Sequence, residues 1–293
     1  MKIDVAGAAV IDKARARKSF GRAAETYDDV AVLQREVGER MLRRMDFVKM
    51  QPLRILDLGS GTGIQAGHLL KKYPKSRIYA LDFALPMLRK TATRGRWLKR
   101  PLCMCGDMEQ LPLGNASVDL IYSNLAFQWA NDLSTLFSEC LRILKPGGLL
   151  MFSTFGPDTL KELRSAWSAV DDFPHVSPFI DMHDIGDSLL QSRFAEPVME
   201  VDQLRLTYAT VDQLMRDLKH LGAHNSVRGQ SRGLTGKARM QAMRKAYEEF
   251  RTQDLLPASY EVVYGHAWAP NLPSAVPGTG VDARDERAGF SSV

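Results

Sequence analysis

The sequence predicts an α/β fold with a Rossmann-like, doubly wound and mostly parallel sheet. Between residues 54 and 154, four short apolar runs alternate with stretches of helical periodicity, an order typical of strands joined by covering helices. A glycine-rich turn follows the first of these runs. The 293-residue chain can bury a large core, and its 45% hydrophobic and 25% charged residues are ordinary for a globular protein.

Each predicted element follows from this pattern. The predicted strands are residues 54–58, 77–81, 118–122 and 149–152, and the helices between them are 64–72, 86–93 and 133–144. Two later strands are predicted at 198–208 and 258–268, with helices at 211–221 and 237–251 between them. In such a sheet the ligand site lies at the carboxyl ends of the strands.

The chain divides into five predicted parts. Residues 1–50 form an N-terminal helical cap, because apolar residues recur at helical spacing from 27 to 45. Residues 51–204 form the ligand-binding core, 205–257 a helical insertion that acts as a lid over the acceptor, and 258–269 the last core strand. Residues 270–293 are rich in Pro, Gly and charge, which predicts a disordered tail. No apolar stretch is long enough to span a membrane, so a cytoplasmic protein is expected.

The three cysteines predict neither a disulfide framework nor a metal site. Cys103, Cys105 and Cys140 are too few and too badly spaced for either, and we expect buried, apolar thiols.

The glycine-rich turn reads LDLGSGTGIQAGHLL from Leu56 to Leu70. Glycines let the backbone turn tightly and approach a ligand, and the helix that follows offers free N–H groups. Gly59-x-Gly61-x-Gly63 indicates a methyl-donor site, whereas Gly-x-Gly-x-x-Ala, counted from Gly61, indicates a dinucleotide. The loop alone leaves both open.

Residues at the next strand ends favour the methyl donor. Asp82 ends the second strand, where a carboxylate can accept hydrogen bonds from both ribose hydroxyls. Gly106-Asp107-Met108 follows a further expected strand, the third in chain order, and an acid there suits the amine of adenine, with Met108 against the ring. Residues 123–129, Ser-Asn-Leu-Ala-Phe-Gln-Trp, end the fourth strand beside the expected methyl group. Together with the loop they indicate S-adenosylmethionine.

With these motifs in place, the chain resembles the class I S-adenosylmethionine-dependent methyltransferases, and most closely the malonyl-[acyl-carrier protein] O-methyltransferases of biotin synthesis. The glycine loop carries the wider likeness. The closer one rests on FGRAAETY at 20–27 with AVLQ at 31–34, on residues 123–129 and 162–167, on LGAHN at 221–225 and on YEVVYGHAW at 260–268. It runs from about residue 14 to 270.

The resemblance implies methyl transfer to the free carboxylate of a malonyl thioester on acyl carrier protein, giving the ester that starts pimeloyl synthesis. A carboxylate is already ionised at neutral pH and needs no general base, and no His/Asp or Cys/His pair stands in a convincing position. Arg164 is expected to steer the carboxylate, and Tyr27 and Gln34 to close over the donor. No metal is expected. The predicted donor-binding residues are Gln34, Asp57, Gly59, Ser60, Gly61, Gly63, Asp82, Phe83, Met87, Gly106, Asp107, Met108, Asn124 and Leu125.

Two basic stretches offer surfaces for an acidic carrier. Residues 89–100 hold six basic and no acidic side chains, and residues 216–251 hold nine basic and three acidic ones. The second stretch lies in the predicted lid, so Arg228 and Arg232 are favoured for docking.

Three alternatives remain open. They are methylation of another small acceptor such as a quinone precursor, methylation of RNA, and a regulator that binds the donor without catalysis. A basic pI near 9.1 favours RNA, but no recognisable RNA-binding module is present, so a nucleic-acid partner is not expected.

Overall fold

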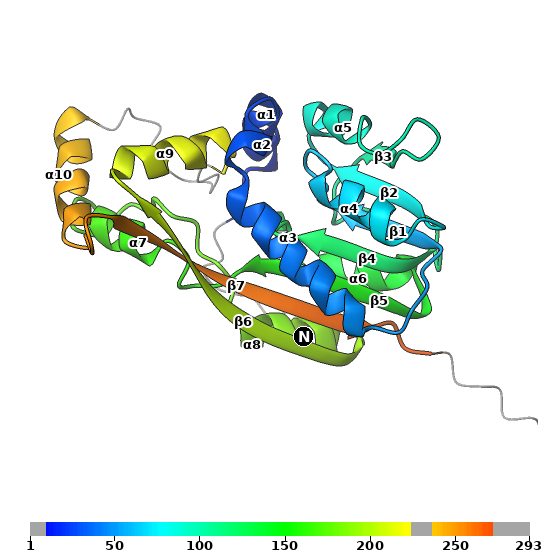
Figure 1. Ribbon diagram of the computed structural model, residues 1–293. Helices are drawn as coiled ribbons and strands as arrows, with labels where there is room; N and C mark the ends of the chain where they lie inside the picture. The colour runs from blue at the N-terminus through cyan, green and yellow to red at the C-terminus, as the bar shows by residue number, and fades with distance from the viewer. Residues whose placement is uncertain (1–9, 224–235, 272–293) are drawn as a thin grey trace, which may run out of the picture.

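The computed structural model describes residues 10–223 and 236–271, which are arranged around a seven-stranded sheet (Figure 1). The strand order is β3-β2-β1-β4-β5-β7-β6. Strands β1 to β5 are parallel, and β7 runs antiparallel to both of its neighbours. The predicted doubly wound, mostly parallel α/β fold is therefore confirmed.

The strands are β1 Arg54–Leu58, β2 Arg77–Asp82, β3 Leu102–Cys105, β4 Val118–Asn124, β5 Leu144–Phe155, β6 Ala195–Tyr208 and β7 Leu256–Trp268. The α-helices are α1 Lys13–Ala23, α2 Tyr27–Val30, α3 Val32–Arg44, α4 Ile64–Lys72, α5 Leu85–Thr91, α6 Leu133–Ile143, α7 Lys161–Ser168, α8 Met182–Gln191, α9 Val211–His220 and α10 Lys237–Glu248. Short 3-10 turns occupy Met45–Phe47 and Phe127–Trp129.

The central strands are apolar on both faces because helices cover both. In β1, Ile55 belongs to the core cluster that includes side chains of α3 and α4, whereas Leu56 and Leu58 belong to the cluster that includes α6 and α8. Burial on both faces explains why β1, β4 and β5 appear in the sequence as continuous apolar runs rather than as alternating ones.

Helix starts are set by local hydrogen bonds. The side chain of Asp132 accepts from Ser134 N and Thr135 N at the start of α6. At α9, Thr210 and Gln213 form a reciprocal capping box. Pro86 stands in the first turn of α5, where its missing N–H costs no helical hydrogen bond.

The segment predicted as a cap has two roles in the fold. Helix α3 lies along the sheet, where Leu33, Val37 and Met41 are buried in the core (Figure 1). Helices α1 and α2 lie beyond the carboxyl ends of the parallel strands, with α1 packed on α5. Of the described residues of this segment, those of α1 and α2 lie over that edge of the sheet.

The C-terminal half extends the sheet beyond its parallel part. Strand β6 continues to Tyr208, past the predicted boundary at residue 204, because it pairs with β7 from Ala195↔Trp268 to Tyr208↔Leu256. Helices α7, α9 and α10 gather beside this extension (Figure 1). Arg228, Arg232 and the predicted tail from residue 272 onward lie outside the described residues.

The expectation of buried thiols is confirmed for Cys140 and wrong for Cys103 and Cys105. Those two are exposed because β3 is the edge strand of the sheet. Within the described residues, no helix combines the length and apolar character that crossing a membrane requires, and no group of three His, Cys, Asp or Glu side chains is arranged to hold a metal ion.

Candidate active site

The glycine loop between β1 and α4 requires all three of its glycines. Gly59, Gly61 and Gly63 have φ angles of +75°, +54° and +79°, a left-handed conformation that residues with a Cβ adopt at a cost. A Cβ on Gly59 would come within 2.3 Å of the Ala126 Cβ, and one on Gly63 within 2.7 Å of Thr91. A Cβ on Gly61 would instead meet no atom within 4 Å, because it would project into an open cavity.

Strand β2 holds this loop in place. Gly59 N and Ser60 N both donate to the carbonyl of Leu81, at 2.8 and 3.0 Å. Gly61 N donates to Asp82 Oδ2 at 2.9 Å, and Ala84 N donates to Asp82 Oδ1 at 2.8 Å. Asp82 therefore fixes the loop while its oxygens keep lone pairs for a ligand.

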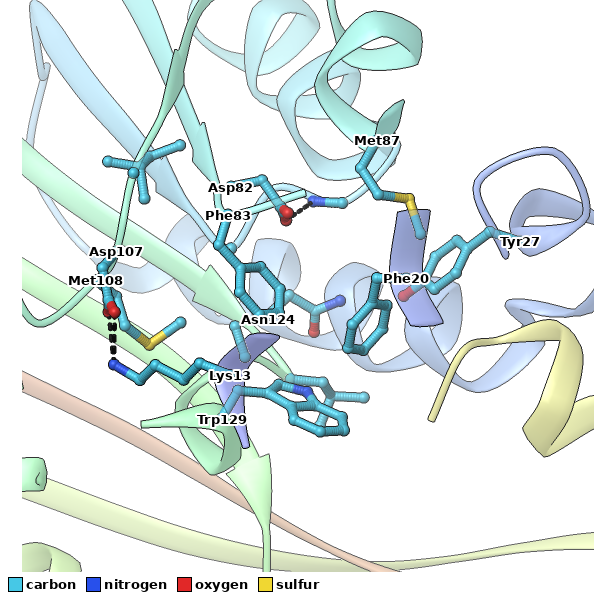
Figure 2. A pocket seen from close by; sticks show the side chains of 16 residues that line it. Lys13, Phe20, Tyr27, Asp82, Phe83, Met87, Asp107, Met108, Asn124 and Trp129 are labelled. Carbon is cyan, nitrogen blue, oxygen red and sulfur yellow. Dashed lines mark hydrogen bonds and ion pairs between the residues drawn. The ribbon is translucent and has the colours of Figure 1, made fainter. Parts of the chain in front are cut away.

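The loop forms one wall of a cavity of about 620 Å³ at the carboxyl ends of β1, β2, β3 and β4 (Figure 2). We call it the donor cavity. Eleven of the predicted site residues line it, and they are Tyr27, Gly59, Gly61, Asp82, Phe83, Met87, Gly106, Asp107, Met108, Asn124 and Leu125.

Burial changes the acidity of the carboxylates near the loop. It raises the pKa of Asp82 to about 6, although hydrogen bonds from Ala84 and Gly61 oppose the shift. The pKa of Asp57 rises to about 8, first through burial and then through the nearby negative charge of Asp82.

Four predicted donor residues do not line the donor cavity, and three of them, Asp57, Ser60 and Gly63, belong to the end of β1 and the loop after it. Asp57 is 1% exposed and lies beneath the loop, where it accepts a hydrogen bond from Ala66 N of α4. Ser60 is buried, and Gly63 sits at the start of α4 as its N-cap. None of the three is among the residues that line the donor cavity.

A second cavity, of about 1030 Å³, adjoins the first, and we call it the acceptor cavity. The two share Phe20, Tyr27, Leu125 and Trp129 as lining residues. The remaining lining comes from Val30, Gln128, the segment 155–179 and residues in or next to α3, β6, β7 and α9, and it is mostly apolar and aromatic. A molecule in each cavity would meet at the four shared side chains.

Two predicted site residues lie elsewhere than expected. Gln34 lines the acceptor cavity and not the donor cavity, since α3 carries it away from the glycine loop. Arg164 lines neither of the two. Its guanidinium donates to the carbonyls of Pro157 at 2.8 Å and Thr159 at 3.1 Å, so it braces the turn before α7. It is thus not placed to steer a carboxylate.

The shared wall contains a strained residue and a perturbed phenol. Leu125 has a φ of +50°, which is uncommon for leucine, and is held there by hydrogen bonds from its N–H to the carbonyl and hydroxyl of Ser153, both at 3.0 Å. Burial raises the pKa of Tyr27, and the charges of Asp82 and Asp28 raise it further, so its hydroxyl keeps its proton at neutral pH.

The sequence did not predict a His/Asp pair, yet the structure forms one. His175 lines the acceptor cavity, and its Nε2 lies 2.8 Å from Asp171 Oδ1. The ring of His175 stacks on that of Trp167, with centroids 3.7 Å apart and planes at 10°. Trp167 lies in α7, and Asp171 and His175 follow the helix. The backbone after α7 is irregular, so no periodic pattern in the sequence indicated that the three side chains meet.

Three further lining residues were missed. Phe20 and Trp129 pack edge to face with ring centroids 4.9 Å apart, and both lie in stretches on which the resemblance rests. Lys13 of α1 donates to both carboxylate oxygens of Asp107, at 2.7 and 2.8 Å (Figure 2), and also to the carboxylate of Glu109. A lysine in a charged N-terminal stretch carries no sequence signal for such a role.

The residues of the donor cavity fit S-adenosylmethionine. The open space at Gly61 lets a ligand lie against the loop backbone. Asp82 and Asp107 are acceptors suited to ribose hydroxyls and an adenine amine, and Phe83, Met87 and Met108 supply apolar surface for a flat base.

Comparisons with known proteins agree with this geometry. Residues 56–152 match the family model described as a methyltransferase domain. A Bacillus halodurans C-125 protein assigned as a methyltransferase shares the fold with a TM-score of 0.57 and 16% identity over 80% of this chain and 99% of its own. Phosphoethanolamine N-methyltransferase 2 of Haemonchus contortus, solved in complex with S-adenosylmethionine, gives a TM-score of 0.51 at 18% identity over 80% of this chain and 53% of its own. The protein is an S-adenosylmethionine-dependent methyltransferase.

A full-length relative narrows this class. The malonyl-[acyl-carrier protein] O-methyltransferase of Gallionella capsiferriformans (strain ES-2) is 52% identical over 267 residues, which cover 89% of this chain and 92% of the relative. The chain belongs to the malonyl-[acyl-carrier protein] O-methyltransferase family.

Replacing Asp57 with Asn should make the fold more stable at alkaline pH. With its pKa raised to about 8, Asp57 keeps a proton in the folded state that the unfolded chain releases near pH 4. The folded state therefore binds more protons between these values, and wild-type stability falls as pH rises through that window. Urea unfolding of the ligand-free protein at pH 5 and pH 8.5 should show a larger advantage of Asp57→Asn at pH 8.5. An equal advantage at both would contradict the shift.

Removing the Lys13 ammonium should speed release of the donor. Lys13→Met breaks a partly buried ion pair that ties α1 over the donor cavity, and such pairs contribute about 1 kcal/mol, or roughly fivefold in the rate. Stopped-flow measurement of S-adenosylhomocysteine dissociation tests this. Lys18→Met, which changes an exposed lysine of the same helix, is the matched control and should leave the rate unchanged. Equal rates for Lys13→Met and wild type would show that α1 does not retain the ligand.

Proposed function

We propose that this protein transfers a methyl group from S-adenosylmethionine to the free carboxylate of a malonyl thioester on acyl carrier protein. The observation that carries the proposal is the pair of adjoining cavities, which meet at Phe20, Tyr27, Leu125 and Trp129. One cavity fits the donor. The other is larger and mostly lined by apolar and aromatic side chains, which suits a thioester arm, and the family's carrier-linked substrate supplies the acceptor's chemistry.

The proposed reaction needs no general base. When bound, the donor supplies an electrophilic sulfonium methyl, and the acceptor oxygen is already an anion at neutral pH. The residues of the shared wall must therefore hold the acceptor oxygen in line and exclude water. Positioning of this kind can lower a barrier by roughly 7–11 kcal/mol.

The donor-side residues have distinct proposed roles. Asp82 would accept from the ribose hydroxyls and Asp107 from the adenine amine, while Gly59 and Gly61 let the ligand approach the backbone. Asn124 ties strand β4 to α3, because its Nδ2 donates to the Gln34 carbonyl at 2.8 Å. The fixed strand end then presents Leu125 to both cavities.

Tyr27 is the proposed positioning residue on the acceptor side. Its phenol lines both cavities and stays protonated, so it can donate one hydrogen bond to a bound acceptor. Asp28, the next residue, accepts from the hydroxyl of Thr62 in the glycine loop and from Arg94. The loop that holds the donor therefore also holds the helix that carries Tyr27.

A transfer assay tests the function. Purified protein with methyl-labelled S-adenosylmethionine should label malonyl-carrier and leave free malonate and bulk tRNA unlabelled. Gly61→Val should abolish the labelling, because its side chain would fill the open space beside the loop. Labelling of tRNA instead, or of a small acid alone, would contradict the proposal and support an alternative acceptor.

We further propose that the acidic carrier docks on the basic stretch 216–251. Helix α9 in this stretch lines the acceptor cavity with Asp217, Leu218 and Leu221, so a carrier bound there has a short path for its arm. Reversing Arg228 and Arg232 to Glu should raise the KM for malonyl-carrier about tenfold at low salt without changing donor affinity.

The matched control for docking is Arg96→Glu with Arg100→Glu, which reverses two exposed arginines of the other basic stretch. Steady-state kinetics of both double variants decide between the two surfaces. A rise in KM only in the control would move the docking surface to residues 89–100.

A further inference from the structure

An exposed apolar turn lies between α5 and β3, on the side of the molecule away from α7, α9 and α10 (Figure 1). Arg96 and Lys99 form an antiparallel bridge, and Lys99 N donates to the Arg96 carbonyl at 2.7 Å. Trp97 and Leu98 therefore occupy the two central positions of a tight turn, where they are 81% and 85% exposed. We call residues 95–100, all of which are exposed, the tip.

Neither turn geometry nor packing explains these two side chains. The central positions of tight turns favour Gly, Asn, Asp, Pro and Ser, which adopt the required backbone angles or hydrogen-bond to the backbone. A side chain that is more than four-fifths exposed also gains little from burial in the folded chain. Trp97 and Leu98 together form an apolar patch in contact with water, which is available to a partner.

The residues at its base hold the tip in place. Arg94 donates through Nε to the Thr62 carbonyl at 2.9 Å, and its guanidinium pairs with the carboxylate of Asp28. On the other side of the turn, Lys99 Nζ donates to the Pro74 carbonyl at 3.1 Å. The fold therefore presents the two apolar side chains outward on a braced support.

The tip belongs to a strongly basic surface. Residues 89–100 hold six basic and no acidic side chains, a charge of +6, whereas the whole chain carries +5. Arg89, Arg96 and Arg100 are exposed, and none of them forms an ion pair within the part of the chain that the structure describes. Their charges are thus free to attract an anionic partner.

The size of the tip decides which anionic partner fits it. A specific protein interface takes about 800 Å² from each partner, and one tryptophan with one leucine supplies roughly half of that at most. A bilayer needs no matching pocket. Tryptophan is favoured at the level of the lipid headgroups, and each lysine or arginine near the surface strengthens binding to anionic lipid.

We propose that the tip binds the surface of a bilayer that contains anionic phospholipid. Trp97 and Leu98 enter at the depth of the headgroups, and the basic side chains around them lie against lipid phosphates. Such a contact is reversible, because it combines a small apolar insertion with electrostatic attraction. Strands β3 and β6 are opposite edges of the sheet, so the contact lies at the other end from the acceptor cavity that β6 helps to line.

Sedimentation with vesicles tests the contact. Vesicles of phosphatidylcholine with about 30% phosphatidylglycerol should bind the full-length protein at least about tenfold more strongly than phosphatidylcholine alone, and salt near 1 M should remove the difference. Trp97→Ser with Leu98→Ser should lower binding about tenfold, and so should Arg96→Gln with Arg100→Gln. Phe47→Ser removes an 88% exposed aromatic side chain outside the basic stretch; this matched control should bind like the wild type.

Tryptophan fluorescence distinguishes insertion from adsorption by charge alone. Of the four tryptophans, all of which lie in the described residues, Trp97 is the one that is largely exposed. Anionic vesicles should shift the emission of the wild type to shorter wavelength, because the indole leaves water. Trp97→Phe should keep most of the binding and lose the shift. Binding without a shift in the wild type would overturn the insertion.

The other outcomes are equally decisive. No binding to anionic vesicles, equal binding to neutral ones, or undiminished binding of the Trp97→Ser, Leu98→Ser variant would each overturn the proposal. Loss of affinity for purified carrier or tRNA in that variant, with no vesicle binding by the wild type, would assign the tip to a protein or a nucleic acid instead. Unchanged binding of S-adenosylhomocysteine shows that each variant is folded. Methyl transfer in solution should be unchanged, so failure of this inference leaves the proposed function intact.

Discussion

The hydrogen bond from Gly61 N to the carboxylate of Asp82 is the contact on which the arrangement of the site depends. It joins the glycine loop after β1 to the end of β2, and Gly59 N and Ser60 N reinforce it at the Leu81 carbonyl. The left-handed loop can hold its shape only with these partners. Because the loop also reaches Asp28 through Thr62, the position of Tyr27 depends on the same contact.

The two cavities illustrate how a fold can separate cofactor binding from substrate choice. The donor cavity is built from the ends of four parallel strands, and the hydrogen bonds of the sheet fix their spacing. The acceptor cavity is built from helices and loops added around the antiparallel extension β6–β7. The residues that would contact an acceptor therefore lie mostly outside the parallel strands that hold the donor cavity. The likeness to solved structures at 16–18% identity therefore extends to the fold and not to the acceptor.

This separation explains what the sequence could predict. Strand ends have local signals, namely a glycine that needs a positive φ, or an acid directly after an apolar run. Asp82, Asp107 and Asn124 were found in that way, and the structure brings them together. Lys13 and His175 have no such signal, because each acquires its role from a partner that only the folded chain supplies. Arg164 was expected from its place in the sequence to steer the carboxylate. In the folded chain its guanidinium donates to the backbone carbonyls of Pro157 and Thr159 instead.

A methyltransferase whose acceptor is an anion must bind that anion and still leave an oxygen free and reactive enough to attack the methyl group. A strong cation, such as a bidentate arginine, would bind the carboxylate well but would withdraw charge from the attacking oxygen and stabilise the ground state. In the function proposed above, Tyr27, which lines both cavities, would align the carboxylate through one hydrogen bond without adding charge.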